Sequence, residues 1–463
     1  MKTKKYTIVC KQILFVLLCI LMADCCIFGA GRIFTVGALG FRMILVGVIC
    51  IIGLPICFLE WIILIKNKYF LAILVFGLWQ MVEAFRGIIA GNRPGLILSD
   101  IKGFMYFILL PIMLLTLVNK QRILMLMKVG MYASTVLSLF SILLIAVYIK
   151  LPSVFNEIFE FGLERNFSGF GAITPALPRL FFHSSMYAVC GCAFAMFFYM
   201  ADLGKKTIKY ILIASFNLVA LLLTFTRSIY LGTGAAAVFL GIIFWFHLKN
   251  EGKRRLLNYM SRTTVVFLIM VIGIGFCTRE NYLDYAFQRT FGFSFVQKLE
   301  FMVENSNETI VENNNETIVE NNSSSKDRKD QYQELTKESD QYRKLTIDDL
   351  IEKIQEAPLV GSGLGAELEF RPEGYNEYIF LDIWVKSGIV GLVLYIVPLI
   401  VMCYDGVKKI LRRDSDDMVL ISLLAVLLGF FTFSFFNPYM NASLGIIFYC
   451  FCMAGFSWQI GIK

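Results

Sequence analysis

The chain has 463 residues, of which 57% are hydrophobic, and carries a formal net charge of +8. Its mean hydropathy of +0.69 excludes an ordinary soluble protein, because apolar stretches of about 20 residues, long enough to cross a bilayer, recur along most of the chain. We therefore expect an all-α, polytopic membrane protein. The positive charge gathers in short loops between these stretches, so it reports topology, and we expect no nucleic-acid partner.

The apolar pattern predicts about twelve transmembrane helices. The first lacks a clear cleavage site and is expected to be retained. Nine spans form an N-terminal bundle over 1–278, a long loop covers 279–376, and three spans form a C-terminal bundle over 377–463. The expected spans are 9–30, 41–65, 69–90, 103–118, 129–149, 181–201, 208–226, 228–248, 263–278, 379–403, 417–436 and 441–460.

Basic residues predict the orientation of these spans. They occupy every second loop, together with the N-terminus, and this side is expected to be cytoplasmic, with both termini there. Residues 279–376 contain 11 Lys or Arg and 20 Asp or Glu, a net charge of −9, and a long acidic loop can be translocated regardless of its charge. The basic loop residues are Lys66, Lys68, Lys120, Arg122, Lys128, Lys205, Lys206, Lys209, Lys249, Lys253, Arg254, Arg255, Lys408, Lys409, Arg412 and Arg413.

Two segments on the opposite side are candidates for function. Residues 150–180 are aromatic and contain Gly and Pro, which suits a segment that lies in the membrane interface. Within 279–376, an Asn- and Glu-rich repeat predicts disorder near 303–340, because it has too few apolar residues to bury a core. An amphipathic helix is expected near 346–356, ending before Pro358.

Five arginines are expected on the outer face: Arg165, Arg179, Arg227, Arg343 and Arg371. Guanidinium groups suit a diphosphate, because their planar donors bind two oxygens at once. The alternative is that each arginine anchors the protein at the interface. For Arg227 the sequence favours substrate binding. The short Thr-Arg-Ser turn lies between two apolar helices, so the charged side chain has few other polar surroundings available.

Further candidates follow along the chain. Gly361, Gly363 and Gly365 occupy alternate positions of PLVGSGLG, where exposed amides would hold phosphate or sugar, although a tight turn explains the pattern equally well. Glu377 is a candidate general base, or simply a favourable charge at a helix N-terminus. His183 is a candidate polar group of the substrate pocket.

Three local pairs and groups have structural explanations. Asp382 and Lys386, four residues apart, are expected to stabilise their helix. Glu83 and Arg86 are expected to pair within their span, or to line the substrate cavity. The twelve cysteines lie mostly in apolar spans and lack partners typical of a metal site, so we expect neither a metal nor a cofactor.

Three motifs together resemble the superfamily of O-antigen ligases and O-antigen polymerases, which are bacterial envelope glycosyltransferases. The first is LTFTRSIYLG around Arg227. The second is QYRKLTIDDLIEKIQEAPLVGSGLG (Gln341–Gly365), which resembles the end of the family's long periplasmic loop. The third is EYIFLDIWVKSGIVGLVLYI, which begins at Glu377 and resembles the family's helix with a His-Asn and a Glu-x-Gly element.

The resemblance implies a GT-C-like fold in the bacterial cytoplasmic membrane and a metal-independent, inverting transfer from a polyprenyl-diphosphate-linked oligosaccharide. When the motifs are aligned on Gly388 and Gly391, the family's histidine falls on Glu377, its asparagine on Tyr378 and its glutamate on Lys386. Ligases are thought to use that histidine, so its replacement favours a polymerase of O-antigen, capsule or exopolysaccharide units.

The resemblance leaves two alternatives open. One is a ligase that uses a different base to transfer glycan to a lipid or protein acceptor. The other is a solute transporter, which should show broken helices and polar sites near the bilayer midplane in repeated halves. No such repeat is visible in the sequence. For a polymerase, the expected partners are the lipid-linked oligosaccharide, the bilayer, and a chain-length regulator and flippase of the same pathway.

Overall fold

The structure, a computed structural model, describes residues 2–29, 33–36, 39–168, 171–174, 177–202, 207–291, 341–369, 377–412 and 417–458. Arg371 and the repeat expected near 303–340 lie outside these residues. The described chain is almost entirely helical, with two small antiparallel hairpins formed by β1 with β2 and by β3 with β4.

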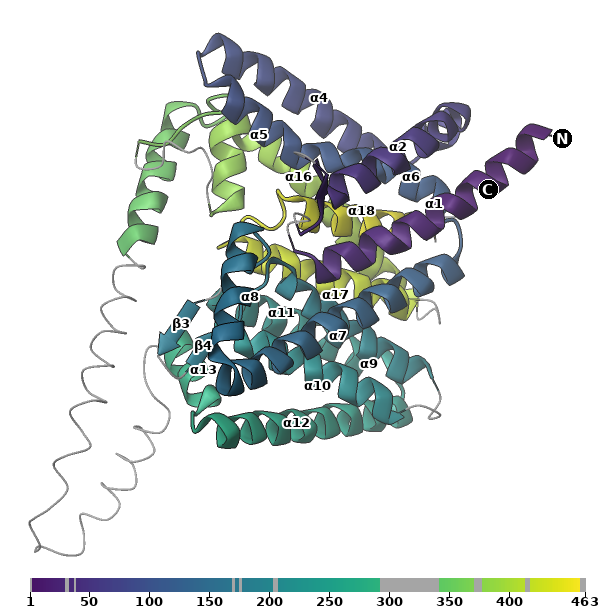
Figure 1. The fold of residues 1–463 in the computed structure, drawn as a ribbon. Coiled ribbons are helices and arrows are strands. Elements are labelled where there is room, and N and C mark those ends of the chain that lie inside the picture. The colour runs from purple at the N-terminus through teal and green to yellow at the C-terminus, as the bar shows by residue number, and fades with distance from the viewer. Residues whose placement is uncertain are drawn as a thin grey trace, which may run out of the picture.

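The first half of the chain is a series of long helices joined by short connections (Figure 1). In chain order the elements are α1 (Lys2–Ile27), β1 (Thr35–Val36), β2 (Leu39–Gly40), α2 (Phe41–Leu59), α3 (Trp61–Ile65), α4 (Lys68–Ile89), α5 (Pro94–Phe104), η1 (Met105–Ile108), α6 (Leu109–Thr116), α7 (Lys120–Lys150) and α8 (Pro152–Glu164).

The second half continues in the same way. Its elements are β3 (Gly171–Thr174), β4 (Leu177–Arg179), η2 (His183–Tyr187), α9 (Ala188–Ala201), α10 (Thr207–Leu223), α11 (Arg227–His247), α12 (Asn250–Thr278), α13 (Tyr282–Phe291), a helix over 341–356, α16 (Ile379–Arg412), α17 (Asp417–Ser434) and α18 (Ser443–Trp458).

These helices confirm the expectation of an all-α, polytopic membrane protein. In the described part of the chain, nine helices are long and apolar enough to cross a membrane, and α10, α17 and α18 are shorter apolar helices. The twelve segments correspond in order to the twelve expected spans. Three begin well before the expected residue, at Pro94, Lys120 and Asn250. In α7 and α12 the Lys- and Arg-rich first turns continue the helix.

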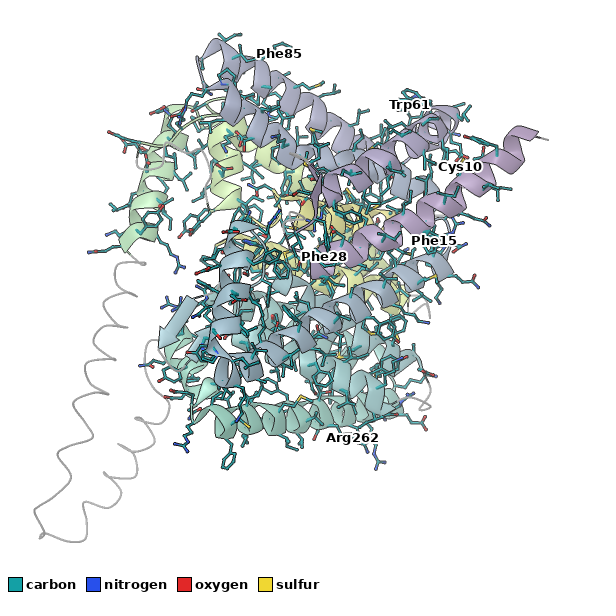
Figure 2. The ribbon with its side chains drawn as sticks, in the orientation of Figure 1. Cys10, Phe15, Phe28, Trp61, Phe85 and Arg262 are labelled. Atoms are coloured by element: carbon teal, nitrogen blue, oxygen red, sulfur yellow. The ribbon has the colours of Figure 1, made fainter. Side chains whose placement is uncertain are left out.

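Large apolar side chains mark both the core and the surface of the bundle. One extensive buried cluster joins the first helices to the last, with α1 against α7, α4 against α16, and α11 against α17. Many other large apolar side chains are exposed, such as Phe85 on α4, whose side chain points away from the bundle (Figure 2). Such an apolar outer surface is what a bilayer requires of the helices that it surrounds.

The bundle has two ends that differ in character (Figure 1). We call the end that carries α8, the β3–β4 hairpin, α13 and helix 341–356 the loop face. The opposite end, where α1 begins and α18 ends, is the terminal face. There Lys11 pairs with Glu60 at 2.7 Å and Lys68 pairs with Asp405. The polar groups of functional interest lie on the loop face.

A buried ion pair between the first two helices, with a hydrogen bond to the last helix, lies near the loop face. Arg42 Nε lies 2.6 Å from the Asp24 carboxylate, and both side chains are only 2% exposed. Arg42 also donates to the Asp24 carbonyl at 3.3 Å and to Ser443 Oγ at 3.0 Å. Charges buried at this depth are tolerated when they are paired and hydrogen-bonded, so the arrangement joins α1, α2 and α18.

Candidate active site

The turn between α10 and α11 sets Arg227 on the loop face. Residues 224–226 leave the helical conformation, and Phe225 is fully buried with φ at +45°. Arg227 is then the first residue of α11. Its Nε donates to the main-chain carbonyl of Arg289 in α13, so the turn predicted from the Thr-Arg-Ser sequence is joined to the segment that follows α12.

Arg179, at the end of β4, lies against the same turn. Its Nε donates to the Thr224 carbonyl at 3.0 Å and its Nη2 to Thr226 Oγ1 at 3.1 Å. Burial lowers the pKa of Arg179, and the positive charges of Arg289 and, to a smaller extent, Arg343 lower it further. These three guanidinium groups are therefore close enough to influence one another electrostatically.

The helix over 341–356 brings Arg343 to this group. Within the described residues the helix covers 341–356, so it includes five residues before the expected start at 346, and Arg343 is one of them. Two turns further on, Leu350 and Ile354 pack against Tyr378 and other apolar residues at the start of α16. The helix therefore lies over the beginning of α16, immediately after Glu377, which is half-buried.

The connection between α17 and α18, residues 435–442, contacts the residues at the starts of α11 and α16. The ring of Phe436 meets that of Tyr378 edge-on, with centroids 6.5 Å apart. The Asn437 amide donates to Ser228 Oγ, next to Arg227, and Tyr439 lies within electrostatic range of Arg179. The connection thus links the starts of α11 and α16 on the loop face.

The glycine segment has a packing role in the structure. Gly361, Gly363 and Gly365 all have positive φ, between +76° and +84°. A Cβ would lie 2.5 Å from the Gly388 nitrogen if placed on Gly361, and 2.6 Å from the Gly87 nitrogen if placed on Gly363. Only glycine allows such a conformation together with such a close backbone approach.

Several amides of this segment have partners within the protein. Ser362 donates to the Val385 carbonyl at 2.7 Å, Leu364 to the Glu83 carbonyl at 3.0 Å, and Gly365 to the Asp100 carboxylate at 2.8 Å. These contacts favour the tight-turn alternative over the phosphate cradle. The segment packs the end of the long loop between α4, α5 and α16.

The Glu83–Arg86 pair stabilises the packing of the glycine segment. Arg86 Nη1 lies 2.7 Å from the fully buried Glu83 carboxylate, and Arg86 also donates to the carbonyls of Val360 and Gly361, at 2.7 and 2.9 Å. The pairing expected within the span is present. Its additional role as an anchor for the glycine segment was not evident from the sequence.

Two further candidates lie in different surroundings. Arg165 follows α8, is exposed, and sits over the Phe161 ring, with one nitrogen 3.3 Å from Thr35 Oγ1. These contacts favour interfacial anchoring. His183 opens η2, and its Nε2 lies 3.1 Å from Asn166 Oδ1, so it joins η2 to the end of the α8 segment.

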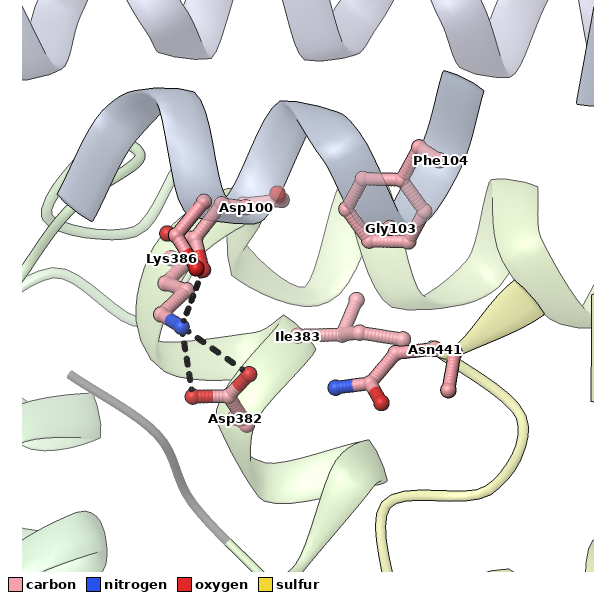
Figure 3. Close-up of a pocket in the computed structure, with 10 residues that line it drawn as sticks. Asp100, Gly103, Phe104, Asp382, Ile383, Lys386 and Asn441 are labelled. Atoms are coloured by element: carbon pink, nitrogen blue, oxygen red, sulfur yellow. Dashed lines mark hydrogen bonds and ion pairs between the residues drawn. The ribbon is translucent and has the colours of Figure 1, made fainter. Parts of the chain in front are cut away.

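A cavity of about 160 Å³ lies between α5, the start of α16 and the α17–α18 connection (Figure 3). Lys386 Nζ, on one wall, lies 2.8 Å from the Asp100 carboxylate and 3.0 Å from that of Asp382. The expected Asp382–Lys386 pair thus belongs to a three-residue group that also contains Asp100. Asn441 and Phe104 form other parts of the wall.

Sequence reasoning missed three of the residues that make up this region. Arg289 lies in the long loop predicted over 279–376, where the amphipathic pattern of α13 was the available signal. Asp100 and Asn441 carry no local signal, because each meets its neighbours only after helices far apart in the chain have packed together.

The arrangement of arginines suits the binding of a strongly anionic group. Arg179, Arg227, Arg289 and Arg343 gather around the α10–α11 turn and α13, and we call them the arginine cluster. Preorganised guanidinium groups stabilise negative charge that develops on a leaving diphosphate. Glu377 precedes the helix against which helix 341–356 packs, and a carboxylate there can accept a proton.

Comparison with known proteins agrees with the sequence resemblance. Residues 211–396 match the family model of O-antigen ligases. The matched segment runs from α10 to the middle of α16 and includes Arg227, Arg289, Arg343, the glycine segment and Glu377. It supports the superfamily of O-antigen ligases and polymerases without separating the two activities. A search of curated proteins found no match.

Proposed function

We propose that this chain, whose residues 211–396 match the family model of O-antigen ligases, is a polymerase. The reaction joins polyprenyl-diphosphate-linked oligosaccharide repeat units into a longer glycan. The loop face is the extracytoplasmic side of the bacterial cytoplasmic membrane, because the basic short loops lie on the terminal face. The donor's energy resides in its glycosyl-diphosphate bond, so no nucleotide is required.

The arginine cluster is the observation that carries this proposal. Burial lowers the pKa of Arg179, and the positive charges of Arg289 and Arg343 lower it further because they repel the charge of Arg179. A bound diphosphate would relieve this repulsion, because each phosphate brings negative charge and several acceptor oxygens. The interfacial position of the cluster suits a head group whose polyprenyl tail lies in the bilayer.

The transfer itself needs one base and one stabilised leaving group. Glu377 accepts the proton of an acceptor hydroxyl, whose oxygen attacks the anomeric carbon of the donor sugar. The bond from that carbon to the diphosphate oxygen breaks, and the diphosphate leaves with the electron pair, stabilised by the arginine cluster. Attack from the face opposite the leaving group inverts the anomeric configuration.

The residue at position 377 favours polymerase over ligase activity. Glutamate stands where the resembled family has the histidine that ligases are thought to use. The product distinguishes the two reactions. Purified protein supplied only with lipid-linked repeat units should make longer glycans that remain on polyprenyl diphosphate. A product that forms only after a lipid acceptor is added would identify a ligase instead.

Glu377→Gln tests the base assignment. The amide keeps the size of the side chain but cannot accept the proton, so polymer formation should fall about 10²–10⁴-fold. Glu60→Gln on the terminal face is the matched control and should retain wild-type activity. Both variants are compared at equal abundance in the membrane. Wild-type activity of Glu377→Gln would remove the base assignment.

A further inference from the structure

The cavity beside α5 has two kinds of wall (Figure 3). Asp100, Asp382, Lys386 and Asn441 form a polar side, and Phe104 with Ile383 forms an apolar side. None of these six residues belongs to the arginine cluster. A mixed wall of this kind suits a ring that carries hydroxyl groups on its edge and C–H groups on its face.

The polar side has a net negative charge and built-in order. Lys386 Nζ contacts Asp100 at 2.8 Å and Asp382 at 3.0 Å, and the three side chains are 5%, 14% and 6% exposed. The two carboxylates and one ammonium give a net charge of −1. The Asp100 carboxylate accepts from Lys386 and from the Gly365 amide, which uses two of its roughly four acceptor positions.

We propose that this cavity is the subsite for one neutral sugar ring of the acceptor glycan. Its volume of about 160 Å³ resembles that of an engineered cavity, about 150 Å³, that holds one six-membered benzene ring. Carboxylates accept hydrogen bonds from sugar hydroxyls, and the Asn441 amide can both donate and accept. The net negative charge disfavours a uronic acid or a phosphorylated sugar.

The place of the cavity fits an acceptor. Asp382 lies about one helical turn inside the start of α16, and Glu377 lies two residues before that start. Asp382, which lines the cavity, is therefore only five residues from the proposed base along the chain. The connection that carries Asn441 also carries Asn437 and Tyr439, which reach the arginine cluster, so acceptor and donor would meet along one connection.

This inference rests on the proposed function, but its test does not require turnover. The probe is the repeat-unit oligosaccharide, released from its polyprenyl diphosphate by mild acid. Its binding to the purified full-length protein in lipid nanodiscs is measured by saturation-transfer NMR. Asn441→Ala removes one polar partner, and Ala442→Leu fills part of the cavity without removing any. Asp405→Asn on the terminal face is the control carboxylate change.

Asn441→Ala and Ala442→Leu should each weaken binding at least tenfold, while Asp405→Asn and Arg227→Ala should bind as the wild type does, because the probe has no diphosphate. Methyl hexosides should displace the probe and methyl hexuronates should not. Wild-type binding by both cavity variants, no binding by the wild type, or stronger competition by hexuronates would each overturn the subsite. Loss of polymer formation in Arg227→Ala with intact probe binding would concern the donor site alone.

Discussion

Arg227 carries a positive charge and also connects two helices. Its Nε holds the Arg289 carbonyl, so the residue fixes α13 against the start of α11 while it presents its guanidinium to the loop face. A lysine can place a charge in the same region but has neither the Nε donor nor the planar fork. The two side chains should therefore behave differently here, even though both are cationic.

We expect Arg227→Lys to fail nearly as badly as Arg227→Ala. Loss of a charge-assisted contact costs roughly 1.5–3 kcal/mol, which corresponds to about a tenfold to hundredfold lower turnover. The measurement is polymer formation from purified lipid-linked repeat units, with abundance in the membrane determined in parallel.

Arg165 provides the matched control for that comparison. It is exposed, lies over Phe161, and contacts Thr35. Arg165→Lys should keep nearly full activity, because lysine anchors at an interface as arginine does. Arg165→Ala should also keep nearly full activity, because an anchoring residue takes no part in the reaction. Full activity of Arg227→Lys would place Arg227 in the same class and end its assignment to the diphosphate.

The glycine segment acts at the scale of whole elements. It closes the long loop by fitting main chain against main chain between α4, α5 and α16. Gly388 lies on the other side of this contact, inside α16, with φ at +66° and ψ at −179°. A Cβ there would lie 2.1 Å from the Leu359 carbonyl oxygen. The kink in α16 is therefore part of the packing of the loop.

Three alanine variants separate the contributions to this packing. Gly77→Ala, in an open helical position, should stabilise slightly, by about 0.5–1 kcal/mol. Gly91→Ala has positive φ but no neighbour within 4 Å and should destabilise by about 1–2 kcal/mol. Gly388→Ala combines strain with collision and should cost about 3 kcal/mol or more. Thermal unfolding midpoints in detergent give this order, and an equally stable Gly388→Ala would contradict the close contact.

Local patterns were readable from the sequence, and contacts between distant segments were not. Glu83 with Arg86, and Asp382 with Lys386, are three and four residues apart, so helix geometry alone brings them together. Asp100 joins Lys386 across 286 residues, and no local pattern announces such a partner. The role of the glycines depended in the same way on where α4 and α5 lie.

At the scale of the whole molecule, the apolar runs specified the helices, and the basic loops predict the orientation. Single cysteines introduced at Ser324 and Asn258 test the orientation with an impermeant thiol reagent. The background must lack reactive native cysteines, including the exposed Cys277. In intact cells only the cysteine at 324 should react, because 279–376 is expected outside and the exposed Asn258 of α12 inside.

Permeabilised cells provide the control, since both positions should then react. Labelling at 258 in intact cells would invert the molecule and put the arginine cluster on the cytoplasmic side. The lipid-linked donor would then have to be used before it crosses the membrane, and the proposed place of the reaction would be wrong.

The Arg42 contacts also bear on the order in which the helices assemble during synthesis. Asp24 and Arg42 lie 18 residues apart, so the charge can be neutralised as soon as the first two spans have left the ribosome. The hydrogen bond to Ser443 spans 401 residues and becomes available only when the final span arrives. The earliest helices can therefore enter the bilayer as a neutral pair, while their complete fastening waits for the last segment to be synthesised.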